Sequence, residues 1–218
     1  SSPSGVITGG NSGTDETTIT ESELLNSTNS PAVLTYTVTP TTPDGCTGDP
    51  FTVSVTVNPL GQVDNPGDQE FCNNDNIIIN FTTDNTGGST TFEWTNTNSA
   101  IGLSNSGSGN INVTATNTTN DPITSTVTVT PSFEGCEGDS QTFTITVNPS
   151  SQVDEVDSQI LCNADETTAI SFSTENTGGT TTYTWVNDTP SIGLAATGSG
   201  DIASFAAVNN STSPVTAT

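Results

Sequence analysis

The chain has 218 residues, of which 24 are Asp or Glu, and it contains no Lys, Arg or His, so its formal net charge is −24. Nucleic acids and anionic membrane surfaces are bound mainly through Lys and Arg, so this composition excludes both as partners. It also removes the imidazole base, the Schiff-base amine and the phosphate-binding guanidinium from catalysis. We therefore expect a non-catalytic protein, and its apolar runs are too short for direct membrane insertion.

Apolar and polar residues alternate along several short segments of the chain. The clearest are TYTVTP, FTVSVTVNP, STVTVTP and TFTITVNP, in this order. Their period of two and their β-branched residues predict strands that are buried on one face. No segment keeps a helical apolar period over three turns. The sequence therefore predicts an all-β fold.

Sequence motifs recur at a period of about 90 residues. Gln62 recurs as Gln152 and Trp94 as Trp185, at offsets of 90 and 91 residues. NSTNSP at 26–31 likewise matches NTTNDP at 117–122. We expect three segments, which are the C-terminal part of a first repeat, a complete repeat and the N-terminal part of a third, at residues 1–60, 61–149 and 150–218. The chain is then a window from a longer tandem array.

The complete repeat is predicted to contain short strands separated by turns rich in Asn, Asp, Gly and Pro. In chain order the expected strands are Asp68–Cys72, Ile77–Thr82, Thr90–Asn96, Ile101–Ser104, Ile111–Thr116, Thr124–Thr130 and Gln141–Val147. Seven strands in about 90 residues are typical of an immunoglobulin-like sandwich. The predicted architecture is therefore a tandem array of immunoglobulin-like β-sandwich repeats.

Two matched stretches, TDNTGGSTTFEWTN and TENTGGTTTYTWVN, each place a Gly-Gly turn before a tryptophan. Trp94 and Trp185 could stack on sugars, but their recurrence at one strand position favours packing in the core. Phe92 and its counterpart Tyr183 have the same strand parity and should share that core face. We expect Gly87-Gly88 and its counterpart to turn the chain at a structural corner.

Glu93 lies beside Trp94 and invites comparison with the paired carboxylates of glycoside hydrolases. Its repeat counterpart is Thr184, so the carboxylate is no feature of the repeat unit. We expect Glu93 to be an outward-facing strand residue, and we predict no catalytic residue.

Four cysteines allow three pairings. The repeat register favours a Cys72–Cys136 disulfide inside the complete repeat, which leaves Cys46 and Cys162 to pair outside this window. In a simple sandwich the first turn and the last hairpin lie at opposite ends, so this bridge requires a long or folded-back hairpin. A Cys46–Cys72 bridge across a repeat junction and free thiols are the alternatives.

Acidic residues gather near the predicted repeat junctions. They are Asp64, Asp68 and Glu70 at one junction and Asp154, Glu155 and Asp157 at the next. Calcium takes six to eight oxygen ligands from carboxylates and carbonyls, so these residues are candidate Ca²⁺ ligands. No EF-hand spacing is present, and a solvated acidic surface is the alternative interpretation. We expect no other cofactor.

The pattern DQEFC, TTFEW, TVTVTP, GCEGD and TFTITVNP resembles the PKD-like or Ig-like repeats of very large Bacteroidota surface proteins. Among these it is most similar to gliding-motility adhesins of the SprB type. The resemblance covers essentially the whole chain. It implies a long filament on the exterior of the bacterial outer membrane, exported by a type IX system and used for gliding motility or attachment.

Repetition, exported character and missing catalytic chemistry together predict a structural stalk or filament segment of a large cell-surface adhesin. The expected partners are neighbouring repeats of the same chain, and surface polysaccharide or the export and motility machinery through other parts of the protein. The alternative is a Ca²⁺-dependent adhesive or carbohydrate-binding module array of a secreted protein.

Overall fold

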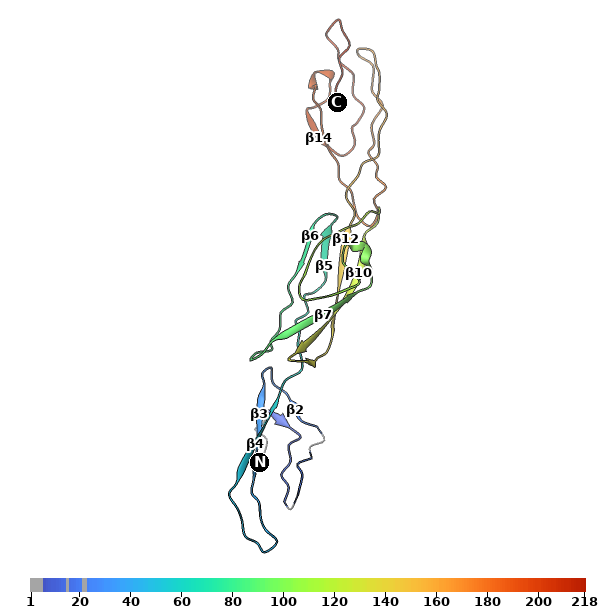
Figure 1. The fold of residues 1–218 in the computed structure, drawn as a ribbon. Coiled ribbons are helices and arrows are strands. Elements are labelled where there is room, and N and C mark those ends of the chain that lie inside the picture. The colour runs from blue at the N-terminus through green and yellow to red at the C-terminus, as the bar shows by residue number, and fades with distance from the viewer. Residues whose placement is uncertain (1–5, 15, 21–22) are drawn as a thin grey trace. The chain divides into compact units, whose positions relative to one another are not determined.

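The computed structural model describes residues 6–14, 16–20 and 23–218 (Figure 1). The fold is all-β, as the sequence predicts. The chain forms two compact units. The first unit consists of Ser1–Thr116 and Ile123–Val147, and the second of Asn117–Pro122 and Asn148–Thr218. In the described ranges, no helix has the length and apolarity needed to cross a membrane.

The N-terminal part of the first unit is built from two strand pairs. β1 (Ile7–Thr8) pairs with β2 (Leu25–Asn26), and β3 (Ala32–Val38) pairs with β4 (Phe51–Val57) along its whole length. Alternation in β3 turns Leu34 and Tyr36 inward, where they form a small core with Ile7.

The segment predicted as the complete repeat contains the largest sheet among the described residues. Its strand order is β5 (Gln69–Cys72), β12 (Gln141–Asn148), β10 (Ile123–Phe133), β7 (Thr90–Asn96) and β8 (Ser106–Ser108). The short strand β11 (Cys136–Glu137) pairs with the end of β10. A separate antiparallel pair is formed by β6 (Asn76–Ile79) and β9 (Ile111–Thr114).

The core of the complete repeat lies between this sheet and the β6–β9 pair. Strict alternation in β10 and β12 buries every second side chain on one face. The buried cluster includes Val127, Val129, Phe143, Ile145 and Val147 from the sheet and Ile77, Ile79 and Ile111 from the pair. Each such side chain contributes about 1.5–3 kcal/mol when fully buried. Two layers around one apolar core confirm the predicted immunoglobulin-like sandwich.

One predicted strand is wrong. The segment predicted as Ile101–Ser104 forms no strand, because Ser99–Ile101 is a 3₁₀ turn. The Asn98 side chain accepts the N–H of Ala100 at its start, and Gly102 ends it in the left-handed region at φ 90°. Ile101 is still completely buried. The apolar pattern thus marked core residues, whereas local capping determined the backbone.

Two short strands were not predicted, and one strand is longer than expected. β8 has the sequence SGS and β11 is two residues long, so neither carries an alternating apolar signal. β10 continues past its expected end at Thr130, through Pro131, to Phe133. Pairing with β7 on one side holds this extension in the sheet.

The second unit repeats part of this plan. β13 (Thr184–Val186) pairs with β14 (Thr197–Ser199) as β7 pairs with β8, and Pro190–Ile192 is again a 3₁₀ turn. Trp185 is half-buried, whereas Trp94 is only 8% exposed. Residues 150–218 contain no counterparts of residues 127–149, which include Val129, the β10 partner of Trp94.

Candidate functional site

The indole of Trp94 is held in the core by two glycines. Its Nε1–H donates to the Gly109 carbonyl at 3.1 Å. A Cβ on Gly107 would lie 2.2 Å from the indole Cζ2, so the ring rests directly on that backbone. Trp185 is held in the same way, donating to the Gly200 carbonyl at 3.2 Å and covering Gly198.

These contacts confirm that Trp94 is a core residue. Phe92 packs against the same core, and its ring centroid lies 5.6 Å from that of Phe81. The counterparts Tyr183 and Phe172 have centroids 5.5 Å apart. Because the Trp94 ring is covered, it offers no flat exposed face on which a sugar could stack.

A shallow open groove of about 470 Å³ crosses β7, β8 and β10. It is lined by Glu93, Trp94, Thr95, Ser106, Gly107, Ser108, Thr128, Thr130 and Glu137. Glu93 is exposed, which confirms the outward-facing strand position expected for it. Its counterpart Thr184 brings no carboxylate to the corresponding place in the second unit.

The first acidic residue of each junction group has a local structural role. The Asp64 N–H donates to the Thr82 carbonyl at 2.9 Å, and its carboxylate accepts the Thr82 hydroxyl at 2.7 Å. Asp154 makes the same two contacts with Ser173, at 2.9 and 2.7 Å. Both carboxylates therefore fasten the start of their repeat to a residue 18 or 19 positions further along the chain.

Asp68 also accepts a backbone hydrogen bond. The Thr144 N–H donates to its Oδ1 at 2.7 Å. This backbone bond, and then the bond from the Thr144 side chain, hold the pKa of Asp68 below its ordinary value because they favour the charged carboxylate. Asp68 thereby connects the start of β5 to the neighbouring strand β12.

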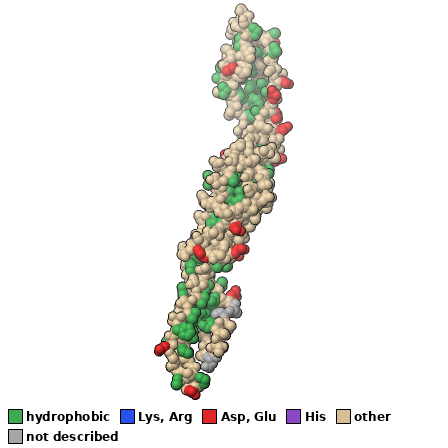
Figure 2. Space-filling view, viewed as in Figure 1, with side chains coloured by type: hydrophobic (Ala, Val, Ile, Leu, Met, Phe, Trp, Pro, Cys, Tyr) green, Lys and Arg blue, Asp and Glu red, His purple; other side chains and the backbone are tan. Residues whose placement is uncertain are grey.

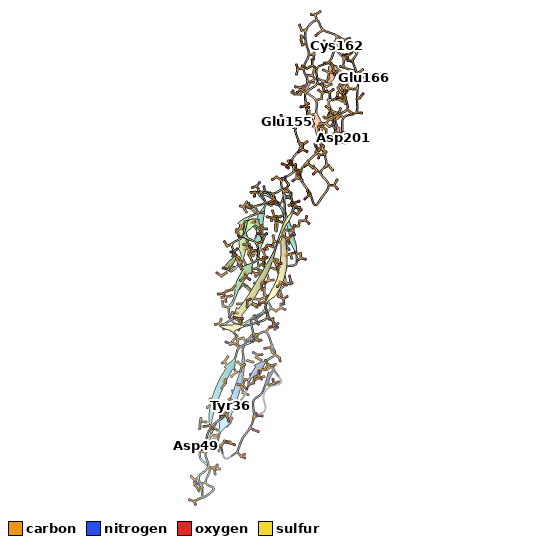
Figure 3. All side chains as sticks on the ribbon, turned by 90° about the vertical axis from the view of Figure 1, so that its right-hand side faces the viewer. Tyr36, Asp49, Glu155, Cys162, Glu166 and Asp201 are labelled. Carbon is orange, nitrogen blue, oxygen red and sulfur yellow. The ribbon has the colours of Figure 1, made fainter. Side chains whose placement is uncertain are left out.

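Glu70, Glu155 and Asp157 are exposed, and Glu155 projects from the edge of the second unit (Figure 3). Acidic side chains are scattered over the face drawn in Figure 2. Among the residues that the structure describes, no three Asp, Glu, Cys or His side chains are gathered as metal ligands would be. The six candidate ligands are thus not brought together, and calcium binding stays a prediction.

All four cysteines are free thiols, so the predicted Cys72–Cys136 bridge is not formed. Cys136 pairs with Phe133 at one end of β10, while Ile123 at the other end pairs with Val147 of β12. The length of β10 separates these ends by roughly 30 Å.

Cys72 belongs to the end far from Cys136. It is the last residue of β5. Asn65 contacts Thr142 and Asp68 contacts Thr144, so this segment runs in the same direction as β12 and Cys72 lies toward the Val147 end of that strand. A disulfide needs Cα atoms about 4.4–6.8 Å apart, so the two thiols cannot meet in this fold. The hairpin after β10 is short and does not fold back, which is the condition that the bridge required.

The Asn of each Asn-Thr-Gly-Gly stretch binds the linker peptide at the start of its repeat. Asn85 accepts the Gln62 N–H through Oδ1 at 2.7 Å and donates to the Leu60 carbonyl at 3.1 Å. Asn176 does the same with Gln152 and Ser150, at 2.9 and 3.2 Å. Both segments follow a Val-Asn-Pro sequence. We call these two side chains the linker clamps.

The residue after each clamp contacts a loop that lies far away in the sequence. The Thr86 N–H donates to the Asn29 carbonyl at 2.8 Å, and the Thr177 N–H donates to the Asn120 carbonyl at 2.9 Å. Both acceptors lie in the matched NSTNSP and NTTNDP loops, at 26–31 and 117–122. We call these two main-chain hydrogen bonds the turn–loop contacts.

Each of these two loops is closed by its first asparagine. Asn26 accepts the N–H and the hydroxyl of Thr28 through Oδ1 at 2.9 and 2.7 Å, and donates to the Ser30 carbonyl at 2.8 Å. Asn117 makes the same bonds to Thr119 and Asp121, at 2.9, 2.7 and 2.8 Å. The sequence repeat therefore specifies a repeated loop conformation.

Sequence reasoning identified both partners of this contact but did not pair them. It interpreted the Gly-Gly turn as a corner of the sandwich and used the NSTNSP match only to set the register. The two patterns lie 55 or more residues apart in the chain, so only folding could bring them together. Their recurrence in constant register was the available signal.

A family model described as a PKD-like domain matches residues 2–61 and 69–151 of the chain. No curated protein matches it.

Proposed function

The chain belongs to the PKD-like domain family, and from this premise we propose that it is a non-catalytic structural segment of a large cell-surface adhesin. Its role is to extend a stalk or filament that carries adhesive parts of the protein away from the cell. The proposal places the protein outside a bacterial outer membrane, exported by a type IX system, in a SprB-type gliding or attachment filament.

Repetition of the contacts between modules is the observation that supports this role. A linker clamp and a turn–loop contact occur twice with the same atoms, at Asn85 and Thr86 and again at Asn176 and Thr177. Contacts repeated at each sequence period suit a chain in which every module meets its neighbours in the same way. An isolated binding module has no neighbouring module with which such contacts could form.

The experiment is an in-frame deletion in the cells that produce the protein. Removing one whole period, residues 61–150, keeps the register of the remaining repeats. We expect the filament, labelled by antibody on intact cells and viewed by electron microscopy, to persist and to be shorter, with attachment retained. Loss of an enzymatic activity, or labelling only after cell lysis, would contradict the proposal.

Calcium is the proposed ligand of the second candidate function, an adhesive array that depends on this ion. Its support is the net charge of −24 without any basic side chain, since bound or nearby cations relieve self-repulsion. If the acidic junction residues bind calcium, 1 mM Ca²⁺ (about this concentration suits extracellular modules) raises the Tm, whereas equal Mg²⁺ does not. An unchanged Tm would reject calcium binding and leave the stalk role unaffected.

A further inference from the structure

A third copy of the loop found at 26–31 and 117–122 lies in the second unit, at residues 209–214. Asn209 accepts the N–H and the hydroxyl of Ser211 through Oδ1 at 2.9 and 2.8 Å, and donates to the Ser213 carbonyl at 3.0 Å. These are the bonds that Asn26 and Asn117 make in the loops at 26–31 and 117–122. All three loops end in proline.

The first two copies are occupied in this structure and the third is not. Asn29 and Asn120 each accept a threonine N–H at their carbonyl. Thr212 holds the same position, and within the described part of the chain its carbonyl receives no hydrogen bond. The final proline shows the same difference, because Pro31 and Pro122 are half-buried whereas Pro214 is exposed.

The occupied copies show what such a loop recognises. The donor is a main-chain N–H and the acceptor is a main-chain carbonyl, so the residue at the acceptor position can vary between Asn and Thr. The next residue of the donor turn is glycine, Gly87 or Gly178, with φ 78° or 76°. A Cβ there would lie 3.1 Å from Pro31 or 2.6 Å from Pro122.

Glycine is therefore required twice at this position of the donor turn. It adopts the left-handed backbone without strain, and it lets the turn approach the loop proline closely. A ligand with an ordinary side chain there would be rejected by both effects. The occupant that fits is a Thr-Gly-Gly turn with a free threonine N–H.

We propose that the loop at 209–214 is a preformed docking site for the Thr-Gly-Gly turn of a following PKD-like repeat. The bound turn donates its threonine N–H to the Thr212 carbonyl and places its first glycine against Pro214. This deepens the proposed function, because it rests on the chain being a segment of a tandem array. It also names the part of the next module that this chain receives.

The second occupied copy has additional side-chain contacts. The Asn120 amide donates to the Glu175 carboxylate at 3.0 Å and accepts from the Gln152 side chain at 3.1 Å, and the Thr177 hydroxyl donates to Asp121. Thr212 and Ser213 replace Asn120 and Asp121 in the third loop. The third loop thus keeps the main-chain site and lacks the amide that binds Glu175.

An extended chain tests the proposal. Pro214 corresponds to Pro122 and Thr218 to Thr126, so a second copy of residues 127–218 is appended after Thr218 and only this copy is labelled with ¹⁵N. It completes the third repeat and adds a Thr-Gly-Gly turn. We expect the N–H of the appended turn threonine to be protected from hydrogen exchange.

Loop variants in the unlabelled part identify the acceptor. N209A removes the side chain that closes the loop, and should lower the protection of the appended threonine roughly fivefold or more. N210A is the matched control, because the structure gives this exposed side chain no hydrogen bond, and it should leave protection unchanged. Exchange of the appended threonine at the unprotected rate, or equal protection in N209A and N210A, would overturn the proposal.

If the extended chain does not fold, the same hydrogen-exchange measurement on the 218-residue chain tests the proposal. The Thr86 and Thr177 N–H groups must then be protected, and N26A and N117A must lower that protection while T118A does not. Unprotected amides overturn the proposal, and protected amides sensitive to these loops support it. These results do not depend on cell-surface location, so failure of the deletion experiment is distinguishable from failure here.

Discussion

The indole of Trp94 lies against the backbone of Gly107 so closely that a methyl group on that glycine would be 2.2 Å from Cζ2. Trp185 and Gly198 repeat this relationship at 2.0 Å. The role of the Gly-Ser-Gly motif is therefore to accommodate the tryptophan ring. Its first glycine gives room to the ring, and the carbonyl of its last glycine accepts the indole N–H.

Substitution of Gly107 by alanine should destabilise the complete repeat. The added Cβ must displace a buried ring, and overpacking of this kind costs about 1–3 kcal/mol. Urea unfolding followed by Trp fluorescence measures the change. G179A is the control, because a Cβ at Gly179 meets nothing within 4 Å. Equal midpoints for the two variants would show that the ring is not held as described.

Removal of the Asn85 side chain should loosen the linker. Asn85 is 8% exposed and bonds the linker at Gln62 and Leu60. N85A removes the hydrogen bonds to the Gln62 N–H and the Leu60 carbonyl, and we expect a loss of about 1–3 kcal/mol in the free energy of unfolding. Limited proteolysis should also cut the Leu60–Gln62 segment faster. N80A, at an exposed position, should change neither measurement, and a resistant linker in N85A would refute the clamp.

The four thiols should all react in the folded chain. Cys46, Cys72 and Cys162 are exposed and Cys136 is half-buried, so maleimide labelling should be fast at the first three and slower at Cys136. Intact-mass analysis after labelling without a reductant counts the modified thiols. A chain that takes up fewer than four labels until it is reduced would show that a bridge forms, contrary to this structure.

Asp68 should make stability depend on pH. Its pKa is lowered in the folded protein by the Thr144 backbone and side-chain bonds. The stabilisation is therefore fully present above the unfolded-state pKa and is lost as pH falls through the lower folded-state pKa. Urea midpoints measured from neutral to acidic pH should fall less in D68N than in the parent. An equal fall of the midpoint in D68N and in the parent would contradict this role of the Thr144 bonds.

Gly178→Ala should weaken the second turn–loop contact. The glycine has φ 76°, and a Cβ would be 2.6 Å from Pro122. We expect the Thr177 N–H to lose protection from hydrogen exchange, while the equivalent Thr86 N–H in the same molecule serves as an internal control. Unchanged protection at Thr177 would contradict the close approach of Gly178 to the loop.

Much of the complete repeat was predictable from the sequence. β7 has the expected bounds, and five other expected strands are present with shifted ends, because strict alternation along β10 and β12 reports a face buried over the whole strand. The turn in the Ile101–Ser104 segment was not predictable. Ile101 and Leu103 are buried, and apolar residues at these two positions are compatible with either a strand or a turn. The strand β8 carries no apolar signal at all.

Some features of the candidate sites could likewise be predicted from the sequence, and others could not. The outward position of Glu93 followed from the residue pattern alone, since its counterpart is Thr184. The Cys72–Cys136 bridge was a wrong inference, because membership of one repeat says nothing about which end of a strand a thiol occupies. The distance along β10 decides that, and only the sheet register supplies it.

The sequence by itself determined the all-β class and the recurring positions that carry the core, because burial of one strand face imposes a period of two and the repeat imposes a register. Only the tertiary structure decided what the Asn-Thr-Gly-Gly turn does. The contact of Thr86 with Asn29 joins main-chain atoms 57 residues apart, and neither the glycines of the turn nor the Asn and Pro of the loop indicate in the sequence that the other segment is the partner. Repetition alone identified both segments, and folding alone paired them.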